Sequence, residues 1–116
     1  MIKLQTKTGV SIDSALLRNY FKTLIDSYFK ILPMKESGTP TLKAYMNSLQ
    51  IEMIGCHELI TAIKDDSMYL SLLAILQYFI DNPDCSVGTV KREVFKAITL
   101  CNKLVLKYSD KEVEAV

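Results

Sequence analysis

The sequence predicts an all-α protein, an antiparallel four-helix bundle with short connections. Apolar residues recur every three or four positions along four stretches of the chain, which is the period of an amphipathic helix. Residues that favour turns, chiefly proline, glycine, asparagine and aspartate, separate these stretches. Because the connections are short, successive helices are expected to pack as antiparallel neighbours.

The first predicted helix covers residues 11–32. Its apolar residues come in adjacent pairs every four positions, from Leu16 and Leu17 onward, with polar pairs between them. Pro33 is expected to end this helix, because proline disfavours helical geometry in the residue before it. Residues 1–10 are predicted to be a flexible N-terminal segment.

The second predicted helix runs from Pro40 to about Lys64. Ile51, Ile54 and Leu59 lie beside its main apolar seam and widen the face, so we expect the helix to contact two neighbours. The seam itself follows the heptad spacing of a helical bundle and consists of Leu42, Met46, Leu49, Met53, Cys56, Ile60 and Ile63. Gly55 lies in the middle of this helix, where close packing of a neighbouring helix is favoured over a kink that opens a pocket.

The third predicted helix, residues 68–80, is apolar nearly all round, so it is either central in the core or part of an oligomer interface. Asp65 to Ser67 offer caps for its first turn. The fourth helix begins at Val87 or Val90 and ends at Tyr108. The bundle domain therefore covers residues 11–108, and residues 109–116 are predicted to be a frayed tail.

Composition indicates one globular domain of 116 residues, with 49% hydrophobic and 23% charged residues. The three cysteines are an odd number without a CxxC spacing, which favours a reducing, cytoplasmic location. The longest nearly apolar run, residues 68–80, is shorter than the stretch of about 20 residues that spans a membrane. We therefore expect neither secretion nor membrane insertion.

No pattern in the sequence predicts catalytic, cofactor or metal chemistry. The single histidine, His57, directly follows Cys56, and adjacent residues of a helix point about 100° apart, so the two cannot act together. Cys56 is expected on the buried seam and His57 on a solvent face. The four glycines form no phosphate-binding loop, and no small-molecule substrate is indicated. We expect a protein that is not an enzyme.

A surplus of apolar residues on the first and third helices predicts a protein interface. We therefore expect a non-catalytic interaction module, either a homo-oligomer or a subunit that binds another protein. The candidate interface residues are all aromatic: Tyr20, Tyr28, Phe29, Tyr69, Tyr78 and Phe79.

A basic ridge on the fourth helix supports an alternative, a nucleic-acid-binding accessory protein. Arg92, Lys96, Lys103 and Lys107 recur at helical spacing and could contact phosphates. Nucleic acid is not favoured, because the net charge is only +1 and no aromatic residue interleaves the ridge for stacking on bases. A further alternative is a small inhibitor that masks a host or phage enzyme through the acidic second and third helices.

The segments Ser71 to Tyr78 and Val90 to Phe95 resemble small uncharacterised all-helical proteins of bacteria, phages and mobile elements. This resemblance implies no activity and no functional residues. The overall plan is also similar to four-helix accessory proteins of reverse transcriptases, which are strongly basic, whereas this chain is nearly neutral.

Overall fold

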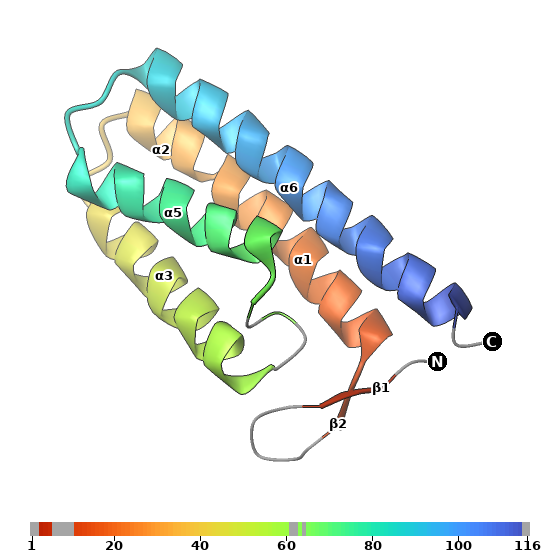
Figure 1. Ribbon diagram of the computed structural model, residues 1–116. Coiled ribbons are helices and arrows are strands. Elements are labelled where there is room, and N and C mark those ends of the chain that lie inside the picture. The colour runs from red at the N-terminus through yellow and green to blue at the C-terminus, as the bar shows by residue number, and fades with distance from the viewer. Residues whose placement is uncertain (1–2, 6–10, 61–62, 64, 115–116) are drawn as a thin grey trace.

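The computed structural model describes residues 3–5, 11–60, 63 and 65–114, and they form an antiparallel helical bundle (Figure 1). The first helix of the bundle has two segments, α1 (Ser14–Phe29) and α2 (Ile31–Glu36). The other three described helices are α3 (Leu42–Leu59), α5 (Ser67–Asp81) and α6 (Val87–Glu114). The predicted all-α four-helix architecture is confirmed.

A short β-hairpin precedes the bundle. Strands β1 (Lys3–Gln5) and β2 (Ser11–Asp13) pair antiparallel, with Lys3 opposite Asp13. The structure thus places β1 inside the segment expected to be flexible, and β2 where the first helix was expected to begin. Strands of three residues are too short to show the alternating pattern by which a sequence identifies them.

The sequence predicted that Pro33 ends the first helix, and this prediction is wrong. Pro33 is the third residue of α2. The first N–H groups of a helix have no partner within it, so proline is tolerated there. The hydrogen bonds continue on either side: Lys30 N donates to Asp26 O at 3.1 Å, and Met34 N donates to Lys30 O at 3.3 Å. Proline, which has no N–H, therefore interrupts the helix near Lys30 without stopping it.

The last helix is longer than predicted. α6 extends to Glu114, so residues 109–114, which we expected to be part of a frayed tail, are helical. These six residues contain neither glycine nor proline, so nothing in the local sequence breaks the helix after Tyr108.

The core lies between these helices. α1 packs most extensively against α6, while α5 packs against both α6 and α3. α5 buries one face and exposes the other, so it is not enclosed on all sides. None of the described helices has the length and apolar composition needed to cross a membrane. The buried residues of α3 and α6 are Met46, Leu49, Met53, Val90, Val94, Ala97, Cys101, Leu104 and Tyr108.

Candidate functional site

Three of the six aromatic residues predicted to form an interface lie in the core. Tyr28, Tyr69 and Phe79 are buried. The Tyr28 hydroxyl donates to the carbonyl of Leu72 at 2.6 Å, and the Tyr69 hydroxyl donates to the carbonyl of Met53 at 2.7 Å. Burial raises the pKa of both hydroxyls above the usual value for tyrosine. These residues join α1, α3 and α5, and are not the partner-facing residues that the sequence predicted.

The other three predicted aromatic residues are at or near the surface. Tyr20 is half-buried, and its hydroxyl is 3.2 Å from that of Tyr69. Phe29 on α1 is 49% exposed and Tyr78 on α5 is 42% exposed. Only Phe29 and Tyr78 of the predicted interface therefore present a large part of their rings to solvent.

Three further apolar side chains are exposed on α3 and α5. Ile51 is 72% exposed, Ile54 is 44% exposed and Leu70 is 43% exposed. We call these three residues the α3–α5 patch. Ile51 and Ile54 belong to the flank that was expected to contact a second neighbouring helix, and the structure leaves them open to solvent. The side chain of Leu59, the third residue of that flank, lies outside the described residues.

Side-chain contacts between α3 and α5 place the patch across both helices. The Gln50 amide donates to the side-chain oxygen of Gln77. Further along the two helices, the rings of His57 and Tyr69 stack with their centroids 6.1 Å apart and their planes 5° from parallel. Ile54 is one helical turn from both Gln50 and His57, so it lies along the edge of α3 that faces α5. Leu70 is seven residues, about two helical turns, before Gln77, so it lies on the same side of α5 as the residue that contacts Gln50.

His57 is half-buried in this contact, whereas the sequence predicted a solvent face. Its side chain is 17% exposed, and its Nδ1 atom is 3.7 Å from a carboxylate oxygen of Glu58. Cys56 is also half-buried and packs against the core. Within the described part of the chain, no group of three or more histidine, cysteine or acidic residues is placed to hold a metal ion. The stacking of its ring on Tyr69 makes His57 part of the packing between α3 and α5.

Gly55 is not explained by close packing, contrary to the prediction. A Cβ atom built at Gly55 would meet no neighbouring heavy atom within 4 Å. The residue is exposed, so no neighbouring helix requires the absence of a side chain there.

The structure divides the predicted basic ridge. Arg92, Lys96 and Lys103 are exposed on α6, but Lys107 forms an ion pair with Asp66. The Nε atom of Arg92 lies 3.7 Å from a carboxylate oxygen of Glu93. All four cations of the ridge are exposed, and Lys107 also attaches α6 to the start of α5.

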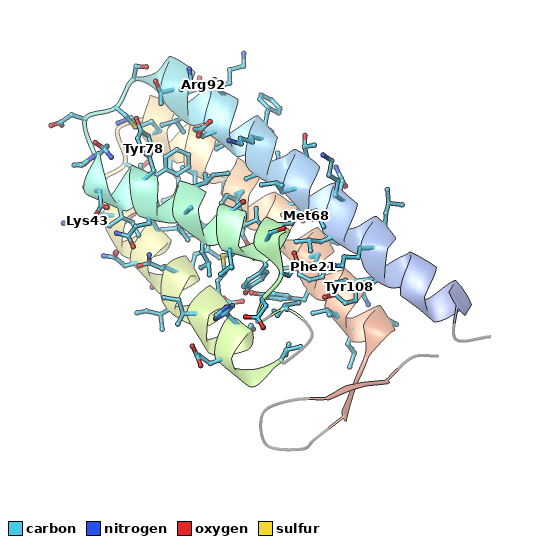
Figure 2. The ribbon with its side chains drawn as sticks, in the orientation of Figure 1. Phe21, Lys43, Met68, Tyr78, Arg92 and Tyr108 are labelled. Carbon is cyan, nitrogen blue, oxygen red and sulfur yellow. The ribbon has the colours of Figure 1, made fainter. Side chains whose placement is uncertain are left out.

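The exposed aromatic ring of Tyr78 lies beside the basic ridge. A shallow groove of about 220 Å³ between α5 and α6 includes Tyr78 and Lys96 in its lining, together with Glu93. Figure 2 shows Tyr78 on α5 next to α6, whose first turns carry Arg92. No periodicity in the sequence could reveal this neighbour, because the two residues belong to different helices. No aromatic residue interleaves the basic ridge along α6, but Tyr78 of the adjacent helix α5 lies beside it.

Comparisons of this chain with protein-family models, with curated proteins and with solved structures found no match. Its function is therefore inferred from its own surface.

Proposed function

We propose that the protein is a non-catalytic interaction module that binds a second protein through the α3–α5 patch. The observation that carries this proposal is the exposure of Ile51, Ile54 and Leu70 on the outer side of two packed helices. Single exposed apolar residues are ordinary on protein surfaces, whereas clustered ones mark interaction sites.

An amphipathic helix is the partner element that fits this surface best. Two packed helices form a valley that accepts apolar residues spaced by three and four positions. Full burial of a branched apolar side chain contributes about 1.5–3 kcal/mol, so three residues that are already partly covered support a reversible complex. Glu58 follows Ile54 by one turn and is exposed, which favours a basic residue near that end of the partner helix.

The test is affinity capture of the tagged protein from its native cells, with nuclease present, followed by mass spectrometry. The test variant is Ile51→Ser combined with Ile54→Ser. The matched control is Phe95→Ser combined with Leu106→Ser, since Phe95 and Leu106 are comparably exposed on α6. We expect the wild type and the control to retain the same partner, and the test variant to lose it.

Light scattering separates the two kinds of partner. If the wild type has the mass of a dimer and the Ile51 and Ile54 variant has the mass of a monomer, the partner is a second copy of this chain. If the partner is an enzyme that the complex inactivates, the protein is an inhibitor. Retention of every partner by the test variant at wild-type level would overturn the proposal.

A second candidate function is binding of single-stranded nucleic acid along α6, and the observation that favours it is the position of Tyr78 beside Lys96. Stacking of a base on an aromatic ring contributes about 1–3 kcal/mol. Exposed cations of the ridge would contact the phosphates on either side. Glu93 lines the same groove and opposes phosphate binding there, which is why this function ranks second.

The test of this second function is titration of a labelled oligonucleotide at several salt concentrations. Combining Lys96→Gln with Lys103→Gln is expected to weaken binding and to reduce the log–log salt slope by about 0.7 for each phosphate that the protein no longer neutralises. The control is Lys22→Gln combined with Lys30→Gln, which removes the same charge from exposed positions on α1 and between α1 and α2. If both double variants lose the same affinity, the net charge of the protein explains the binding, and the ridge is not a specific site.

We also propose that the protein is cytoplasmic. Its cysteines at positions 56, 85 and 101 are free, as is usual in a reducing compartment. Alkylation of freshly lysed native cells is expected to label three thiols on the unfolded chain, and a disulfide detected there would contradict this location.

A further inference from the structure

The α2–α3 and α5–α6 connections lie side by side at one end of the bundle (Figure 1). Residues of both connections line a pocket there. Its volume is about 270 Å³. Core residues from four helices form its floor, and residues of both connections form its rim. The floor consists of Ile31, Met46, Phe79 and Val90, and exposed rim residues are Pro40, Lys43, Asn82 and Pro83.

The pocket has an apolar floor, and the charged residues of its lining are basic. The floor residues are buried, so an apolar group that enters the pocket replaces solvent against the core itself. Of the described residues that line the pocket, the two that carry charge are both lysines, Lys35 and Lys43. Ligand sites commonly combine an apolar lining with a few polar groups that orient the ligand.

The two lysines are held differently. The Lys35 ammonium donates a hydrogen bond to the carbonyl of Pro83 at 2.7 Å, which joins the end of α2 to the α5–α6 connection and fixes this charge near the rim. Lys43 is exposed in the first turn of α3. The carbonyl that holds Lys35 carries no net charge, so this contact is not an ion pair.

We propose that this pocket binds a small amphipathic carboxylate, with its apolar tail against Met46 and Phe79 and its carboxylate beside Lys43 and Lys35. The volume lies just below the range of about 300–1,000 Å³ that is typical of small-molecule sites, so the tail is short. Each methylene group buried contributes about 0.8 kcal/mol, and the charge at the opening selects an anion over a neutral or cationic head group. This site is separate from the α3–α5 patch and does not depend on the proposed function.

Cys85 provides a direct readout, because it is half-buried and lines the pocket. The test follows the rate of alkylation of Cys85 by mass spectrometry while octanoate is added to the full-length protein. Cys56 is a half-buried thiol of the same chain that is not part of the pocket lining, and it serves as the internal reference. We expect octanoate to slow alkylation of Cys85 at least threefold while the rate at Cys56 is unchanged.

Charge selectivity is tested with octanol and octylamine, which carry the same tail on a neutral and a cationic head group. We expect octanoate to bind about tenfold more tightly than octanol by calorimetry, and octylamine to bind least. Lys43→Gln is expected to remove most of this preference, whereas Lys22→Gln, an exposed lysine of α1, is expected to preserve it.

Equal affinity for the three compounds, or no protection of Cys85 by octanoate, would overturn the proposal. Neither result bears on the α3–α5 patch, because partner capture by the Ile51 and Ile54 variant is measured without the ligand.

Discussion

The carboxylate of Asp66 and the ammonium group of Lys107 form an ion pair that joins the start of α5 to the second half of α6. The Asp66 side chain is 1% exposed. Its other carboxylate oxygen caps α5 by accepting hydrogen bonds from the backbone N–H groups of Met68 at 2.9 Å and Tyr69 at 3.2 Å. One buried carboxylate therefore both starts a helix and attaches it to its neighbour.

Asp66→Ala is expected to lower the free energy of unfolding by about 2–3 kcal/mol, because it removes a helix cap and leaves Lys107 without its partner. Asp66→Asn retains an acceptor for the cap but loses the charge, so we expect about half that loss. Urea unfolding measures both changes. Lys103→Met, one turn away on the exposed ridge, is the control and is expected to stay within about 0.5 kcal/mol of the wild type. Equal stability of Asp66→Ala and the wild type would contradict the role of this residue.

Tyr28→Phe tests the hydrogen bond between α1 and the backbone of α5. The ring remains in place, while the carbonyl of Leu72 loses the hydroxyl that donates to it. We expect a loss of about 1 kcal/mol in the free energy of unfolding. Tyr78→Phe removes a hydroxyl from an exposed ring and is expected to leave stability unchanged. Similar losses in both variants would mean that the buried hydrogen bond contributes nothing specific.

Two glycines are expected to respond to alanine in opposite directions. Gly55→Ala should raise the free energy of unfolding by about 0.5–1 kcal/mol, because alanine favours the helix and the new methyl group meets no atom within 4 Å. Gly38→Ala also meets open space, but Gly38 has a φ of +64°, so we expect a loss of about 1 kcal/mol or more. Thermal unfolding of both variants measures these changes. If the two unfolding temperatures shift in the same direction, backbone conformation does not set the different effects of alanine at the two positions.

Stability is expected to fall in alkaline solution. Burial raises the pKa of the Cys101 thiol to about 12, and burial together with the nearby Asp66 charge raises the pKa of the Tyr108 hydroxyl to about 12. The ordinary values are 9.0 for the thiol and 10.0 for the hydroxyl, so as pH rises the unfolded chain releases these protons before the folded chain does. The free energy of unfolding should therefore be level below about pH 9 and fall above it, by up to about 1.4 kcal/mol per pH unit for each group.

Urea titrations between about pH 8 and pH 11 measure this decline. The buried hydroxyls of Tyr28 and Tyr69 contribute to the same decline, so Tyr108→Phe removes one of several groups and should make the decline shallower above about pH 10. Tyr78→Phe, at an exposed ring, should leave the slope unchanged. A stability that rises with pH over this interval would contradict the assignment.

The helical architecture could be predicted because amphipathic periodicity is a local property of the chain. The seam residues Met46, Leu49 and Met53 are buried as expected, and Asp66 caps α5 in the position where a cap was predicted. Local reasoning was wrong at Pro33, because a proline in the first turn of a helix gives the same sequence signal as a proline that follows the end of a helix.

The candidate site could be predicted only in part. Aromatic residues are typical of both cores and interfaces, so composition could not place Tyr28 in the core and Tyr78 at the surface. Ile51 and Ile54 were identified as a second apolar flank, but whether a helix of the same chain covers that flank depends on the complete packing.

The sequence by itself determined the helical class, the main buried seams and the absence of a recognisable catalytic motif, because each of these follows from residue types and spacings along one segment. The tertiary structure decided the rest: that Lys107 pairs with Asp66, that Tyr78 lies beside Lys96, and that an apolar pocket with two lysines opens at one end of the bundle. These relationships depend on how far each helix is rotated about its axis and on which helices become neighbours. Both are set by the packing of all the side chains together, so no single stretch of sequence specifies them.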